Sequence, residues 1–170
     1  MPQGSFLKVG RTETGCVLRI EGRGTMRESK AAHELAVRCV PESGVTVAVD
    51  LSDCENLDST FLGCLIDLQR RFGRGEGSRF SIASPSERCR QLFQTAQVHR
   101  VLNIAPDCPN VQGEYLPVQA AALDSTQTTQ HIMECHRLLA EFEGPSQAAF
   151  RAIANQLERE LTAKAAPQVH

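Results

Sequence analysis

Residues 45–63 read VTVAVDLSDCENLDSTFLG, and this stretch decides the fold. Its first part, residues 45–51, is β-branched or apolar almost without interruption, which is typical of a strand covered on both faces. The polar residues 52–58 predict a turn. Small polar residues then precede apolar residues at helical spacing, which predicts a helix from about Ser59 to Phe72. A buried strand followed by a helix is typical of α/β folds.

The flanking segments continue this alternation. Strands are predicted at residues 6–9, 16–21, 79–83 and 101–104, and helices at about residues 25–40 and 85–96. Residues 22–24 are expected to break a strand, and residues 106–117 to form a proline-bearing connection. The expected fold is therefore α/β, with a mixed, mainly parallel sheet of about four to five strands and crossover helices.

The composition changes after residue 120, where no further strand pattern follows. Helices are predicted from about Ser125 to Phe142 and again after a break at Gly144-Pro145. Their apolar stripes are Ile132, Cys135, Leu139 and Phe142, then Phe150, Ile153, Leu157 and Leu161. We therefore expect a domain at residues 1–120 and a C-terminal helical hairpin at residues 121–170. Because these stripes are too long to leave in water, the hairpin should dock on its own domain or form a homodimer.

The overall composition excludes several classes of protein. With 170 residues and a net charge of -2, the chain has the size of one domain and no general attraction for nucleic acid or anionic membranes. No apolar run approaches the ~18 residues of a membrane span. The N-terminus does not resemble a signal peptide, and the 7 cysteines are odd in number without a CxxC spacing. We therefore expect a cytoplasmic protein with reduced thiols.

The segment Asp58-Ser59-Thr60 is the strongest candidate for a functional site. The simplest interpretation is that these small polar residues cap the helix that follows. The functional interpretation is that a hydroxyl stands beside free N–H groups at the positive end of that helix. A phosphate would be stabilised there by the helix dipole and by those donors.

At these residues the sequence resembles the STAS family, the anti-sigma factor antagonists of bacteria. The family signature is Asp-Leu-Ser, a short loop, then Asp-Ser-Ser/Thr-Gly-Leu-Gly. Here it reads Asp50-Leu51-Ser52, followed by Asp58-Ser59-Thr60-Phe61-Leu62-Gly63, within a resemblance that extends from about residue 5 to residue 105. One position departs, because Phe61 replaces the motif glycine. Its bulk would either clash with a standard kinase or anchor a different partner.

The resemblance implies a function without catalysis by this chain. The hydroxyl after the motif Asp, Ser59, would be phosphorylated by an anti-sigma factor that is a serine kinase, with Thr60 as the fallback. The unphosphorylated form would bind that kinase and free the sigma factor, and a phosphatase would reverse the modification. Asp58, Phe61 and Leu62 would complete the partner-binding surface. No cofactor or metal is implied, since ATP and magnesium belong to the kinase.

This function is phosphorylation-controlled partner switching in transcriptional regulation, and two alternatives stay open. A STAS-like domain can serve as a scaffold or assembly module without phosphorylation. It can also serve as a small-molecule sensor. The first alternative would leave Ser59 unmodified when a kinase and ATP are supplied, and the second would be indicated by a ligand that co-purifies with the protein.

Two further chemistries are disfavoured. A hydrolase would need a histidine base near Ser59, for which His33 and His99 are the candidates, and no Gly-x-Ser-x-Gly nucleophile motif exists. A zinc site built on His131, Cys135 and His136 would need further ligands at short spacing, and none follows. The favoured interpretation is a surface histidine beside a buried Cys135.

Overall fold

The computed structural model describes residues 7–39, 44–73, 77–119 and 124–165. The strands are β1 (Leu7–Arg11), β2 (Gly15–Ile20), β3 (Gly22–Gly24), β4 (Thr46–Asp50), β5 (Cys54–Leu57), β6 (Phe80–Ala83), β7 (Ile104–Ala105) and β8 (Gln112–Pro117). The helices are α1 (Met26–Cys39), α2 (Ser59–Phe72), α3 (Glu87–Thr95), α4 (Ser125–Leu139) and α5 (Gln147–Ala165).

The main sheet has six strands in the order β7-β6-β4-β2-β1-β8. The neighbours from β7 to β2 are parallel, while β1 is antiparallel to both β2 and β8. The short strands β3 and β5 form a separate parallel pair. The prediction of a mixed, mainly parallel sheet with crossover helices is confirmed. The predicted number of four to five strands is wrong, since the main sheet has six.

The additional strands lie where the sequence lacks an apolar alternation. Strand β8 falls in the segment expected to be a proline-bearing connection, and most of its residues are exposed. It pairs on one side only, with β1, and an edge strand tolerates its terminal Pro117. Strands β3 and β5 fall in the expected break and the expected turn, and they pair only with each other. Their formation depends on tertiary pairing rather than on local pattern.

The central strand β4 is covered on both faces, as its composition predicts. Val47 and Val49 belong to the large core beneath α1 and α2. Ala48 points to the other face, where it packs with Val17 and Ala83. This small cluster is covered by Cys108 and Val111 of the connection between β7 and β8 and by Tyr115 of β8. The centre of the sheet is therefore buried, and functional surfaces are expected at its edges, on its loops or on the helices.

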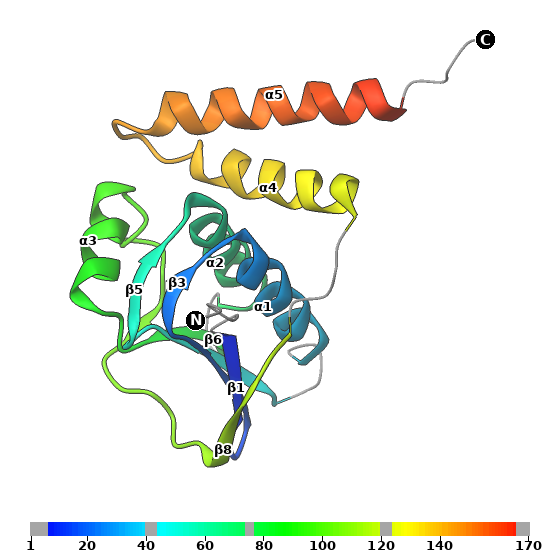
Figure 1. Cartoon of the computed structure of the whole chain (residues 1–170). Coiled ribbons are helices and arrows are strands. Elements are labelled where there is room, and N and C mark those ends of the chain that lie inside the picture. The colour runs from blue at the N-terminus through cyan, green and yellow to red at the C-terminus, as the bar shows by residue number, and fades with distance from the viewer. Residues whose placement is uncertain (1–6, 40–43, 74–76, 120–123, 166–170) are drawn as a thin grey trace.

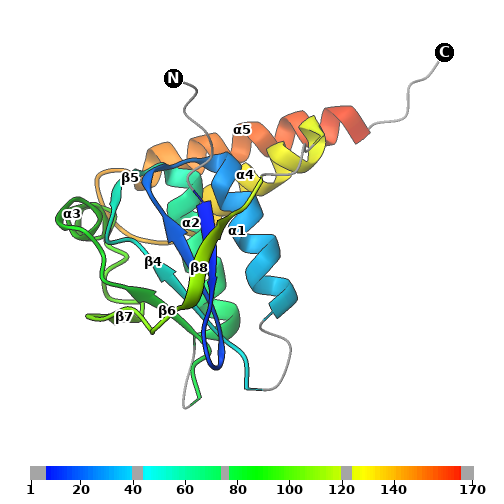
Figure 2. The same ribbon diagram turned by 60° about the horizontal axis from the view of Figure 1, so that its bottom comes forward.

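Helices α1, α2, α4 and α5 form stacked layers on one side of the sheet, and α3 lies beside β5 (Figures 1 and 2). Helices α1 and α2 contact each other against the sheet, α4 lies on α2, and α5 lies outermost against α4. At the start of α1, Glu28 Oε2 accepts the Thr25 N–H at 3.0 Å. The bounds of α2 agree with the prediction, whereas α4 ends at Leu139 rather than at Phe142.

The predicted C-terminal hairpin is present as α4 and α5, and it docks on the chain's own domain. Three predicted boundaries lie outside the described residues: the strand start at residue 6, the helix end at residue 40 and the division between residues 120 and 121. Among the described helices, none combines the length and the apolar character needed to cross a membrane.

Candidate functional site

The first half of the motif builds the turn after β4. Asp50 is buried at the end of this strand, and its Oδ1 accepts the Ser52 N–H at 2.9 Å. Its Oδ2 lies 3.7 Å from Arg19 Nη1 on β2. Arg19 also forms an ion pair with Asp53 in the turn. These contacts fix the path of the chain that leads from β4 towards α2.

Asp58 ties together the beginnings of two helices. Its Oδ1 accepts the Phe61 N–H at 2.8 Å and so caps α2, while its Oδ2 accepts the Met26 N–H at 2.8 Å at the first residue of α1. Its own N–H donates to the Gly24 carbonyl at 2.9 Å. Burial raises the pKa of Asp58 above its ordinary value, while the two accepted N–H bonds act in the lowering direction. The motif aspartate therefore has a structural role that positions the next residue.

Ser59 is the first residue of α2, and it is hydrogen-bonded to the C-terminal hairpin. Its Oγ lies 2.8 Å from Nε2 of His136 on α4, and His136 Nδ1 lies 2.8 Å from the Ile132 carbonyl oxygen. Because a carbonyl only accepts, Nδ1 carries a proton and donates it to the Ile132 carbonyl, while Nε2 is hydrogen-bonded to the Ser59 hydroxyl. The ring of His136 also packs edge-on against Phe150 of α5, with the centroids 5.9 Å apart.

The other residues of the candidate site are buried. Thr60 is 4% exposed, Phe61 0% and Leu62 1%. Phe61 belongs to the main core and reaches towards Gly24, where an added Cβ would lie 3.1 Å from its ring. The expectation that Phe61 and Leu62 present apolar surface to a partner is not met in this conformation, because the first turn of α2 directs them into the core. Ser59 is half-buried, which leaves it the more accessible hydroxyl.

The hairpin covers α2 beyond Ser59 as well. A Cβ built on Gly63 would lie 2.4 Å from the Cys135 carbonyl oxygen and 2.6 Å from the Cys135 Cβ, so only glycine permits this approach. Further along α2, Arg70 forms an ion pair with Glu141, and its guanidinium lies 6.0 Å from the centroid of the Phe142 ring. The hairpin therefore contacts the same side of α2 from its first residue to its last turn.

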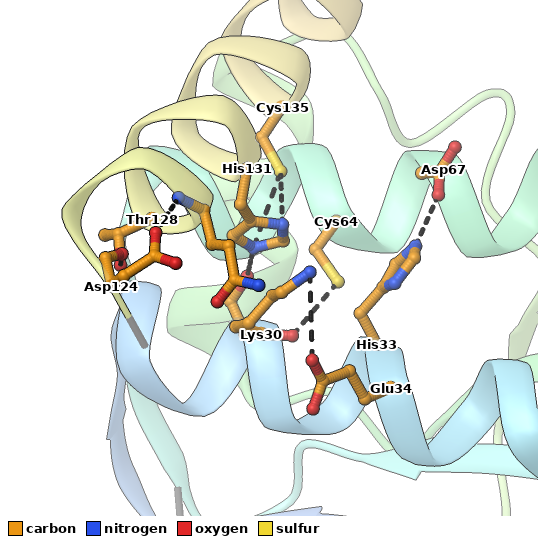
Figure 3. Close-up of polar contacts among 11 residues, drawn as sticks. Lys30, His33, Glu34, Cys64, Asp67, Asp124, Thr128, His131 and Cys135 are labelled. Atoms are coloured by element: carbon orange, nitrogen blue, oxygen red, sulfur yellow. Dashed lines mark hydrogen bonds and ion pairs between the residues drawn. The ribbon is translucent and has the colours of Figure 1, made fainter. Parts of the chain in front are cut away.

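A second serine–histidine pair lies between α1 and α4. Ser29 Oγ is 2.6 Å from Nε2 of His131, and both residues are buried. Figure 3 shows the His131 ring between Cys135 of its own helix and the residues of α1. Burial lowers the pKa of His131 to about 4. The expectation of a surface histidine beside a buried Cys135 is therefore wrong: His131 is 7% exposed and His136 4%.

The histidine that reaches Ser59 is neither of the two candidates that the sequence suggested as its partner, His33 and His99. His33 instead hydrogen-bonds Asp67 of α2, with 2.6 Å between Nε2 and Oδ2. His136 is 77 positions from Ser59, and only the docking of α4 brings them together. The one signal in the sequence is the place of His136 beside the apolar stripe of its helix. Within the described residues, no group of three or more His, Cys, Asp or Glu side chains has a metal-binding arrangement.

Comparisons with known proteins point to one family. The family model described as "Mlab, STAS domain" matches residues 7–104, more than half of the chain. Among solved structures, the anti-sigma factor antagonist SpoIIAA in its unphosphorylated form matches with a TM-score of 0.47 and 15% sequence identity. That match covers 60% of this chain and 89% of that one. No curated protein matches the chain.

Proposed function

Because the chain belongs to the STAS domain family, we propose that it is an anti-sigma factor antagonist-like, protein-binding module of the cytoplasm. It regulates transcription by phosphorylation-controlled partner switching and performs no catalysis itself. Its partner is an anti-sigma factor with serine kinase activity, which supplies ATP and magnesium, and a phosphatase restores the unmodified form. Ser59 is the phosphoacceptor, and the beginning of α2 is the centre of the partner-binding surface.

The observation that carries the proposal is the position of Ser59. It is the first residue of α2, directly after the Asp58 cap, and it is half-buried whereas Thr60 is buried. The positive end of the helix dipole favours a phosphate at this place. A phosphate there changes the charge of the surface without breaking the cap, because the cap is made by Asp58 and not by Ser59.

The chain offers an internal control for this assignment. The sequence Asp-Ser-Thr occurs again at the start of α4, where Asp124 caps the helix by accepting the Gln127 N–H at 2.7 Å. Ser125 therefore has the same local sequence and the same helical position as Ser59, and it is exposed. A kinase that reads only the tripeptide would modify Ser125, whereas a kinase that docks on α2 would modify Ser59.

The test is phosphorylation of the full chain by the anti-sigma-type serine kinases of its source organism, with ATP and magnesium. We expect one phosphate, located on Ser59 by peptide mass spectrometry. It should be lost in Ser59→Ala and retained in Ser125→Ala. A phosphate that persists in Ser59→Ala, on Ser125 or elsewhere outside residues 58–60, would overturn the assignment. Absence of any phosphate with all such kinases would favour the scaffold or sensor alternatives.

A further inference from the structure

One face of α2 is occupied along its length by the chain's own α4. Ser59, Gly63 and Arg70 recur at helical spacing, and each contacts the hairpin: Ser59 through His136, Gly63 through Cys135, and Arg70 through Glu141. We call these three residues the docking face of α2. The opposite side of the same helix packs into the core through Phe61, Leu65 and Leu68. Helix α2 therefore has one side that belongs to the domain and one that receives another helix.

The centre of the docking face is shaped for a helix backbone. Gly63 is buried, and it allows the backbone of Cys135 to lie directly against α2. Glycine costs about 1 kcal/mol relative to alanine inside a helix, so its presence here needs a compensating contact. That contact is the close crossing of two helices, with a small residue on each at the crossing point.

The edges of the docking face are polar and weakly held. The hydrogen bonds of Ser59 with His136 and of Ser29 with His131 contribute about 1 kcal/mol each. The Arg70 to Glu141 pair is largely exposed and contributes no more than about 1 kcal/mol. The outer helix α5 is mostly exposed, since Ala154 is its one buried residue in the described part of the chain, although Phe150 packs against His136 and the core. The buried apolar residues Cys135 and Leu139 of α4 hold the hairpin closed, so the polar edges of the interface are the part that a competing helix can replace at little cost.

We propose that the docking face of α2 is a helix-binding surface that the chain keeps occupied with its own α4. A partner binds there by offering an amphipathic helix with a small residue opposite Gly63, and it binds only when the hairpin has left. The inference rests on the proposed function for the identity of that partner. In the closed form the Ser59 hydroxyl is hydrogen-bonded to His136, and α4 occupies the docking face of α2. The apparent dissociation constant for a partner is therefore the dissociation constant of the open form divided by the fraction of molecules that are open.

The first test opens the interface from the side of α2. Gly63→Ala improves the helix propensity of α2 but places a methyl group against the Cys135 backbone. Gly144→Ala, in the turn between α4 and α5, is the matched control, because its Cβ would meet nothing nearer than 3.5 Å. The readout is alkylation of Cys135 by N-ethylmaleimide, followed by peptide mass spectrometry. Cys54 of β5 and Cys89 of α3 are buried, and they report on the integrity of the domain.

We expect Gly63→Ala to raise the alkylation rate of Cys135 at least about tenfold, the equivalent of about 1.4 kcal/mol of lost docking. Cys54 and Cys89 should stay protected, and Gly144→Ala should behave as the unmodified chain. A wild-type rate at Cys135 in Gly63→Ala would overturn the close docking. If all three thiols became reactive, the variant would have unfolded, and the second test would decide.

The second test opens the interface from the side of the hairpin and leaves α2 intact. Leu139→Asp removes a buried apolar contact of α4, and His136→Ala is a milder alternative if that variant fails to fold. The probe is a fluorescent synthetic peptide of residues 124–165. We expect the full-length Leu139→Asp chain to bind this peptide at least about tenfold more tightly than the wild-type chain, whose own hairpin competes. Adding Gly63→Ala to the variant should abolish binding.

Two results would overturn the helix-binding surface. One is equal binding of the peptide to the wild-type chain and to the opened variant. The other is binding that survives Gly63→Ala, which would place the peptide elsewhere on the protein. Neither test uses a kinase, so the two proposals fail separately. Peptide binding without phosphorylation of Ser59 would support the helix-binding surface and contradict the phosphorylation switch. Phosphorylation of Ser59 without peptide binding would support the switch and contradict the helix-binding surface.

Discussion

The Ser29 hydroxyl and Nε2 of His131 lie 2.6 Å apart at the junction of α1 and α4, with both residues buried. The groups around His131 are Lys30 and His33 of α1, Asp67 of α2 and Cys135 of its own helix. Burial is the main cause that lowers the pKa of His131 to about 4. Lys30 and His33 act in the same direction, and Asp67 opposes them. The closed hairpin therefore holds this histidine neutral.

The stability of the closed form should consequently depend on pH. The pKa of His131 rises towards its ordinary value of 6.5 when the hairpin opens or the chain unfolds. Those states then bind the proton more readily, so the contribution of His131 is fully present above pH 6.5 and is lost as the pH falls towards about 4. Thermal unfolding of the wild-type chain and of His131→Gln, measured across this range, should show a shallower pH dependence in the variant. Identical pH profiles would contradict the linkage.

Replacement of the Asp58 side chain should destabilise the domain more than loss of a single cap. Asp58→Ala leaves the Phe61 and Met26 N–H groups without their acceptor, at a cost of about 2–3 kcal/mol. Asp124→Ala is the matched control, because Asp124 caps only the exposed start of α4, and we expect about 1 kcal/mol or less. Urea unfolding monitored by circular dichroism measures both. Equal losses in the two variants would show that the contact with α1 contributes nothing.

Ser59→Asp should weaken binding to the kinase that modifies Ser59, while the fold survives. The new carboxylate stands beside Asp58 at the centre of the proposed partner surface, where an acidic patch on the partner would be repelled. The helix dipole limits the folding cost to under about 1 kcal/mol. Calorimetric titration gives the affinity, circular dichroism checks the fold, and Ser125→Asp provides the same charge at the start of α4. Unchanged affinity in Ser59→Asp would argue against a charge switch.

Deletion of residues 121–170 should lower the thermal stability of the remaining chain or change its mass in solution. The deletion removes the helix that covers Gly63 and the hydrogen-bond partners of Ser59 and Ser29. Differential scanning calorimetry and light scattering would detect a lower melting temperature, or association through the uncovered face. If both the melting temperature and the mass stayed unchanged, the hairpin would be independent of the domain.

Local signals were sufficient to predict most of the elements. The run of β-branched residues identifies β4, and the Asp58 cap with the apolar spacing that follows identifies both ends of α2. The capping residues of α1 and α3 are visible in the same way, through Thr25 with Glu28 and through Ser86. Each of these elements is specified by residues within a few positions of one another, which is what a sequence pattern can report.

The features that escaped prediction depend on contacts between distant residues. Strand β8 exists because β1 offers a free edge, and its own residues carry no apolar alternation. His136 lies beside Ser59 because Gly63 permits the crossing of α4 over α2, an effect that no local spacing encodes. The same docking explains why the histidine that was expected at the surface beside Cys135 is buried. The hairpin could therefore be predicted from the sequence, whereas its docking position on α2 could not.

Because the hairpin is covalently connected to the domain, the helix of a partner must compete with the tethered helix α4 for the docking face of α2. Only residues 118–124 join β8 to α4. A short tether holds a segment at an effective concentration in the millimolar range. A partner present at micromolar concentration must therefore hold its helix about a thousandfold more tightly than α4 does to occupy half of the molecules. A lengthened tether would lower this threshold without altering a single contact, so the length of the connection would itself set the partner concentration at which the protein responds.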